Sequence, residues 1–187
     1  MYRQGVHATS VDEILAASKT GKSQFYHYFS SKEELVAEVL WHHLDRVLVE
    51  QRPFALERWD GIAAWLNALV DMQEERGCYR GCPLGSLVAE IADADVDDTL
   101  RRHSAAAFAR WELTLAEGLR KMKDAGALRP DADPGLLAEA TMASVQGGYL
   151  LSTAKGRVGP MRNALAAALA FLRSFAEQSG RDSPREP

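Results

Sequence analysis

Residues 5–35 read GVHATSVDEILAASKTGKSQFYHYFSSKEEL, and this stretch decides how the first part of the chain folds. Thr9 and Ser10 are followed three residues later by Asp12 and Glu13, an arrangement typical of a capping box at a helix start. The pattern predicts a short helix over 10–17, with an apolar face, that stops near residue 18.

A second short helix is predicted over 22–28, and a third one follows it closely. Ser31 and Glu34 have the spacing of another capping box, so the third helix should run over 31–51, before Pro53 ends it. Two short helices joined by a tight turn and followed by a third indicate a helix-turn-helix unit, whose second helix enters the major groove of DNA.

The predicted second helix separates its side chains by character. Successive positions are 100° apart, so Phe25 and Phe29 share one face while Ser23, Gln24 and His27 lie on the opposite one. Glutamine can bind adenine through two hydrogen bonds, and serine and histidine can also reach bases. A merely solvated helix face is the alternative interpretation. The candidate DNA-contacting residues, with helix-start and flanking positions included, are Thr9, Ser10, Lys22, Ser23, Gln24, Tyr26, His27, Tyr28 and Lys32.

The rest of the chain also shows the 3.6-residue period of helices and not the alternation of strands, so the fold class is all-α. We expect a helix-turn-helix head over 1–50, a helical-bundle body over 51–179 and a disordered tail over 180–187. Helices in the body are predicted over 59–76, 83–92, 95–125, 134–155 and 160–178.

Composition excludes several classes of protein. The 187 residues are 47% hydrophobic and 26% charged, with a mean hydropathy of −0.24, as expected of a globular chain. No apolar run approaches the length of a membrane span, and two cysteines cannot form a disulfide framework, so we expect a cytoplasmic protein. The net charge of −4 divides into +2 over residues 1–32 and −6 over the remainder, which places a slightly basic segment before an acidic body.

Three segments, 5–14, 22–29 and 31–35, strongly resemble the DNA-binding signature of the tetracycline-repressor (TetR) family. The stretches 81–90 and 126–134 look like the regulatory domain of an LmrA/YxaF-like branch of that family. The resemblance implies a three-helix head and a six-helix body that forms a homodimer through its last two long helices. It also implies a ligand-responsive regulator, a repressor of a palindromic double-stranded DNA operator that a small-molecule effector releases.

Two features depart from the family pattern. Family members usually have glycine where this chain has Lys19, and serine or threonine where it has Gly21, so the turn could be shaped differently. The family's first helix should also occupy some fifteen residues before Gly5, where only Met1 to Gln4 stand. We therefore expect that the family's first helix is either absent or not included in these residues.

A small-molecule pocket is expected among the apolar and polar-tipped residues of the body. Aromatic and methionine side chains at helical spacing are more often core than pocket, and Gln146 and Tyr149 are the better candidates because their tips are polar. With no obvious charge in this set, we expect a neutral, hydrophobic or aromatic effector. The candidate residues are Trp65, Phe108, Trp111, Met142, Gln146 and Tyr149.

The homodimer seam is expected where small and large residues can interdigitate across a two-fold axis. These residues are Ala140, Ser144, Gly147, Gly148 and Leu151 in the helix over 134–155, and Met161, Leu165, Ala168, Leu169, Leu172 and Phe175 in the helix over 160–178.

The sequence carries no motif for a metal, cofactor or catalytic site. Cys78 and Cys82 have CxxxC spacing, which fits structural thiols, with redox sensing as the alternative. His42 and His43 point in different directions on a helix, and no nucleotide-binding or hydrolase motif occurs. We expect no enzyme activity. The competing hypothesis is an all-helical small-molecule-binding protein or enzyme with an inactive DNA-binding head.

Overall fold

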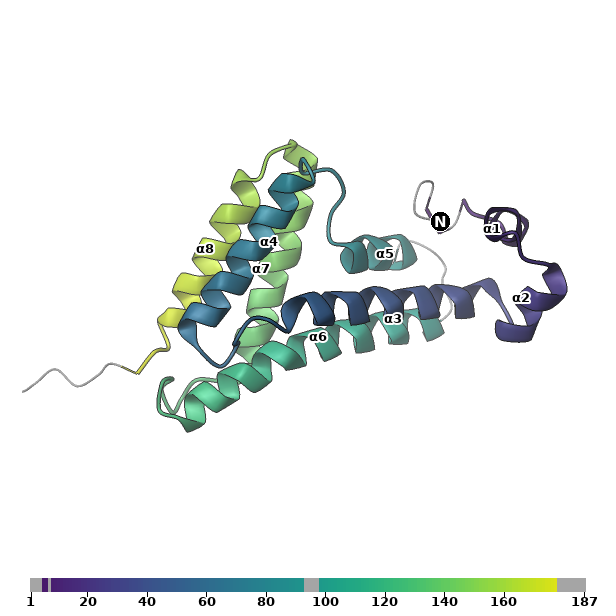
Figure 1. Ribbon diagram of the computed structural model, residues 1–187. Helices are drawn as coiled ribbons and strands as arrows, with labels where there is room; N and C mark the ends of the chain where they lie inside the picture. The colour runs from purple at the N-terminus through teal and green to yellow at the C-terminus, as the bar shows by residue number, and fades with distance from the viewer. Residues whose placement is uncertain (1–4, 7, 93–97, 178–187) are drawn as a thin grey trace, which may run out of the picture.

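The computed structural model describes residues 5–6, 8–92 and 98–177, and this part of the chain forms eight α-helices (Figure 1). Two short helices and the start of a third make the head, and the remaining helices make the body. The helices are α1 (Val11–Ser18), α2 (Lys22–Tyr28), α3 (Lys32–Gln51), α4 (Trp59–Glu75), α5 (Pro83–Ala92), α6 (Asp98–Asp124), α7 (Pro134–Lys155) and α8 (Gly159–Arg173). The predicted all-α class is confirmed, while the first residues of the helix expected from 95 and the tail over 180–187 lie outside the described residues.

The two capping boxes predicted in the head differ in detail. At α1, Ser10 Oγ accepts from the Glu13 N–H and the Glu13 carboxylate accepts from the Ser10 N–H, so this box is confirmed. At α3, Ser31 Oγ accepts from the Glu34 N–H, but the Glu34 carboxylate accepts from the N–H and hydroxyl of Ser30. The prediction is therefore wrong for the reciprocal bond, because the Glu34 carboxylate accepts from Ser30 and not from the Ser31 N–H.

Lys19, which stands where the resemblance leads one to expect glycine, takes the left-handed backbone conformation that glycine favours. The residue has φ 56° and ψ 34°, the left-handed conformation, and its backbone N–H caps α1 by donating to the Leu15 carbonyl. A residue with a Cβ pays about 1 kcal/mol for this conformation. Gly21 serves as the N-cap of α2 in an extended conformation.

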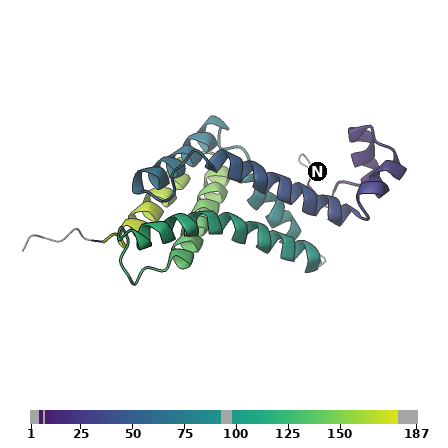
Figure 2. The same ribbon diagram turned by 60° about the horizontal axis from the view of Figure 1, so that its bottom comes forward.

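Helix α3 connects the head to the body. Its first turns begin in the head, and Leu40 and Leu44 further along are fully buried in the main core of the body. Figure 1 shows α3 and α6 side by side and α1 and α2 at the far end of α3, while α4, α7 and α8 form a bundle at the other end; the turned view in Figure 2 agrees. Any displacement of α3 in the body must therefore move the head.

Helix α8 ends at Arg173, earlier than the residue 178 predicted from periodicity. The chain then pairs with the segment after α6: the Arg129 N–H donates to the Phe175 carbonyl at 2.9 Å, and the Glu177 N–H donates to the Ala127 carbonyl at 3.1 Å. Tertiary hydrogen bonds thus replace the last helical turn, although the sequence has no glycine or proline there to signal it.

Helix α6 lies so close to the loop before α4 that only glycine fits at position 118. A Cβ on Gly118 would lie 2.5 Å from the carbonyl oxygen of Leu56. We expect Gly118→Ala to lower the free energy of unfolding by about 1–3 kcal/mol, because a well-packed backbone cannot move aside freely. Urea denaturation measures it, with Glu117→Ala, an exposed neighbour on the same turn, as the control that should change little. Equal stability of Gly118→Ala and the wild type would mean that the loop yields.

The predicted dimer seam is wrong for much of α8. Met161, Leu165, Ala168 and Leu172 are buried inside the protomer against α4 and α7, and Gly148 of α7 faces Met161. Other apolar residues of the two helices, together with Leu151 of the predicted seam, are exposed; on α7, Leu136, Ala143 and Leu150 are spaced by seven residues, which is two helical turns. The exposed residues are Leu136, Ala143, Leu150, Leu151, Ala166, Ala167, Ala170 and Phe171, which we call the α7–α8 stripe.

Candidate DNA-binding head and effector cavity

Helix α2 presents its polar face to solvent at the end of the molecule. Phe25 is 5% exposed and packs against Phe29, whereas Ser23, Gln24 and His27 are all exposed. Lys22 is exposed in the first turn, and the rings of Tyr26 and Tyr28 are 50% and 67% exposed. The structure thus brings six of the nine candidate DNA contacts onto one short, solvent-facing helix (Figure 1).

The other three candidates lie at helix starts, and two of them are engaged in holding the head together. Thr9 is buried, and its hydroxyl donates to the Gly5 carbonyl at 2.6 Å. The hydroxyl of Ser10 caps α1, so only Ser10 and not Thr9 is the N-cap. Lys32 stands at the first position of α3, half-buried, where the helix N-terminus favours a phosphate.

The head also contacts the body near the start of the described chain. The Val6 N–H donates to the carboxylate of Glu90 on α5 at 2.5 Å, and the Val6 side chain packs with Val36, Ala37 and Leu100 in a small apolar cluster. Helix α5 therefore touches the head at one end, while its first residue, Pro83, lines a cavity of the body.

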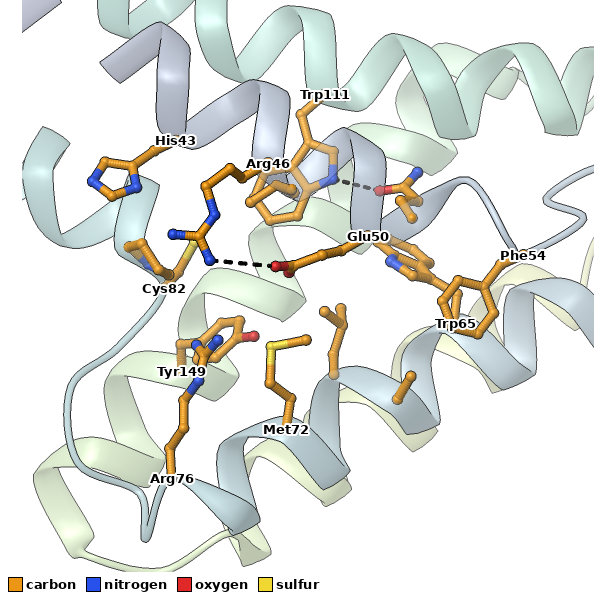
Figure 3. Close-up of a pocket in the computed structure, with 15 residues that line it drawn as sticks. His43, Arg46, Glu50, Phe54, Trp65, Met72, Arg76, Cys82, Trp111 and Tyr149 are labelled. Atoms are coloured by element: carbon orange, nitrogen blue, oxygen red, sulfur yellow. Dashed lines mark hydrogen bonds and ion pairs between the residues drawn. The ribbon is translucent and has the colours of Figure 1, made fainter. Parts of the chain in front are cut away.

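That cavity, of about 530 Å³, lies among α3, α4, α5, α6 and α7 (Figure 3). Its apolar wall includes Phe54, Trp65, Leu69, Met72 and Trp111. Buried Gln51 fixes one side, because its side-chain carbonyl accepts from the Trp111 indole N–H at 2.7 Å and its amide donates to the Thr114 hydroxyl at 2.8 Å. The cavity has the size and the mostly apolar wall of a small-molecule site.

Three of the six predicted effector residues line this cavity: Trp65, Trp111 and Tyr149. The others do not. Phe108 stacks on Trp111 from behind, and Met142 is buried in the core. Gln146 fills the space beside Gly85, which has no side chain to occupy it, so its amide points to α5 instead of the cavity.

Charged groups stand at the cavity wall, and the expectation of a wall without charge is wrong. His43, Arg46 and Glu50 are spaced at i, i+3 and i+7 along α3, and Arg76 caps the end of α4. The spacing of these three residues alone places them along one side of α3, so this polar line is predictable from the sequence. Arg46 and Glu50 pair at 3.7 Å across an exposed surface, so their attraction is weak.

Three titratable groups at the cavity, Tyr149, Cys82 and His43, have pKa shifts that favour their uncharged forms. Burial, with a smaller contribution from Cys82, raises the pKa of Tyr149 far above its usual range, so the phenol is a hydrogen-bond donor at neutral pH. Burial also raises the pKa of Cys82, and burial together with His42 and Arg46 lowers the pKa of His43. Both cysteines are buried free thiols, and thiols buried in apolar surroundings are inert, which favours the structural interpretation of this pair.

A solvent-facing second helix on a helical head, joined by one long helix to a body with an internal cavity, defines the class of ligand-responsive DNA-binding regulators. The family model for bacterial regulatory proteins of the tetR family matches residues 1–39, and the model for the tetracyclin repressor-like C-terminal domain matches residues 55–178. The chain therefore belongs to the TetR family of transcriptional regulators, as predicted.

Individual relatives agree. The chain is 32% identical over 155 residues to an uncharacterized HTH-type transcriptional regulator of Lactococcus lactis subsp. lactis, covering 81% of this chain and 76% of the relative. It is 25% identical over 153 residues to the uncharacterized regulator YxaF of Bacillus subtilis, covering 80% and 76%. The crystal structure of a regulatory protein TetR from Rhodobacter sphaeroides superposes with a TM-score of 0.72 at 23% identity, covering 89% of each chain, which shows the shared fold. No helix among the described residues could cross a membrane.

Proposed function

We propose that this regulator is a repressor that binds a palindromic operator as a homodimer and leaves it when a small molecule occupies the cavity. The observation that carries the proposal is the course of α3, which begins in the head at Lys32 and lines the cavity with its far half, from His43 to Gln51. One stiff helix thus joins the two sites, and the Glu90–Val6 contact adds a second connection through α5.

In this proposal the two heads of a dimer insert α2 into successive major grooves, about one helical turn apart or slightly more. The base-reading residues are Ser23, Gln24 and His27, with Lys22, Lys32 and the two tyrosines at the phosphates. The boundary between head and body falls within α3, near residue 50, and the protein acts in the cytoplasm, where the operator is.

An effector can release the operator only by favouring a head spacing that cannot span two half-sites. Linkage then requires that effector and operator weaken each other by the same factor. We therefore expect saturating operator DNA to raise the dissociation constant of a genuine effector, by a factor between about 5 and 150 if the coupling has the usual size. Titrations followed by the fluorescence of Trp65 and Trp111, with and without DNA from the region upstream of the gene, measure this factor.

The control is the same titration with a scrambled duplex, which should leave the affinity for the compound unchanged. A compound that binds equally well with and without operator would not be an effector. If the protein binds compounds but no DNA of any sequence, the alternative of a small-molecule-binding protein with an inactive head replaces the proposal.

A further inference from the structure

The charges at the effector cavity are unequal in sign. Arg46 and Arg76 bring two positive charges to its wall, and Glu50 brings the one carboxylate that lines it. Among the described residues Arg76 makes no ion pair, and Arg46 is held only by Glu50 at 3.7 Å. Burial, with smaller contributions from His42 and Arg46, lowers the pKa of His43 and so favours its neutral form; the two arginines and Glu50 then give the cavity wall a net charge of about +1.

The positive groups and Tyr149 lie at one side of the cavity, and Phe54 and Trp65 lie at the other. Figure 3 shows Arg46, Arg76, Cys82 and Tyr149 grouped together, with Phe54 and Trp65 on the opposite side. The Tyr149 phenol, which stays protonated, adds a neutral donor beside the guanidinium groups. Guanidinium and hydroxyl donors facing one space are complementary to an anionic oxygen group.

We propose that the effector is an amphipathic anion, with one carboxylate, sulfonate or phosphate group between Arg46 and Arg76 and a flat apolar body against Trp65, Trp111 and Leu69. This inference rests on the proposed function in one respect, namely that the cavity is the effector site. Because Arg46 belongs to α3 and Arg76 to the end of α4, the bound anion bridges the helix that carries the head and the helix that anchors in the body.

Two fluorescent probes with nearly the same aromatic body test the charge requirement. 8-Anilinonaphthalene-1-sulfonate carries one negative charge, and N-phenyl-1-naphthylamine lacks the sulfonate. We expect Arg46→Gln and Arg76→Gln each to weaken the binding of the sulfonate about tenfold, as for loss of a charge-assisted hydrogen bond, and to change the binding of the neutral probe less than twofold. Fluorescence titration of the full-length protein at fixed salt gives both constants.

Glu50→Gln supplies a test in the opposite direction, since a variant that merely fails to fold cannot gain affinity. Removing this carboxylate frees Arg46 and raises the local potential, so the sulfonate should bind several-fold more tightly, with no change for the neutral probe. Arg52→Gln removes a positive charge, as Arg46→Gln and Arg76→Gln do, but at the exposed C-cap of α3 outside the cavity wall; it is the matched control for the arginine variants and should alter neither constant by more than about twofold.

The proposal is overturned if both probes weaken equally in the arginine variants, if neither responds, or if Glu50→Gln weakens the sulfonate. These titrations contain no DNA. A failure of the operator to bind the wild-type protein would contradict the proposed function without changing the probe constants, so the two failures can be told apart.

Discussion

Leu150→Arg is expected to convert the protein to monomers and to reduce its affinity for a palindromic operator by a hundredfold or more. Leu150 is the most exposed of the large apolar side chains of the α7–α8 stripe, at 69%, and it lies beside Leu151 at 48%. A two-fold seam on this stripe would bring both copies of the new arginine into an apolar surface without partners, which is strongly unfavourable. The second head would then no longer be tethered to the first, and the gain from bivalent binding is typically 10²- to 10⁴-fold.

Sedimentation velocity measures the assembly, and an electrophoretic shift with the operator measures the affinity. The matched control is Leu113→Arg on α6, because Leu113 is also 48% exposed but lies outside the stripe. A dimer that survives Leu150→Arg at micromolar concentration would place the interface on another surface.

The predicted dimer seam shows which features sequence periodicity can predict and which it cannot. It identified α7 and α8 correctly as helices, because small and large residues at a 3.6-residue period leave few other structures. Both helices have apolar residues on more than one face, however, so periodicity could not tell which face packs on α4 inside the protomer. Met161 and Leu172 are fully buried there. Only the three-dimensional structure shows which face of each helix is exposed.

The effector site was predictable only in part, for a related reason. Trp65, Trp111 and Tyr149 are large residues in the body, and size and composition alone made them candidates. The charged side of the cavity comes from α3 and the end of α4, which the sequence separates by about one helix length and which only tertiary packing brings together. Gln146 was a sensible candidate by chemistry, but the missing side chain of Gly85 opened a different space for it.

The head was the most predictable part, because its signals are local. Capping at Ser10 and the spacing of Phe25 and Phe29 depend on neighbours within a few residues. The left-handed Lys19 is the exception: propensity disfavours this conformation for a residue with a Cβ, yet Lys19 adopts it at the C-cap of α1. The fold of the head therefore tolerates a local cost of about 1 kcal/mol.

Gln24→Ala is expected to relax the preference for one base pair in each half-site at a cost of about 1–3 kcal/mol per site, while leaving the affinity for random DNA unchanged. Gln24 is exposed in the first turn of α2, on the face opposite buried Phe25, and its amide can donate to and accept from one adenine at once. Alanine keeps the helix and removes both bonds. Competition binding against the operator and its single-base variants identifies the position that loses its preference.

Lys32→Ala provides the contrasting case, because its ammonium group at the start of α3 is suited to a phosphate and not to a base. This variant should weaken binding to all duplexes alike and lower the slope of log affinity against log salt by about 1. The two variants thus have opposite signatures, one in sequence preference and one in salt dependence. If Gln24→Ala weakened operator and random DNA equally, Gln24 would be a phosphate contact or a structural residue, and base reading would have to be reassigned to Ser23 and His27 on the same exposed face.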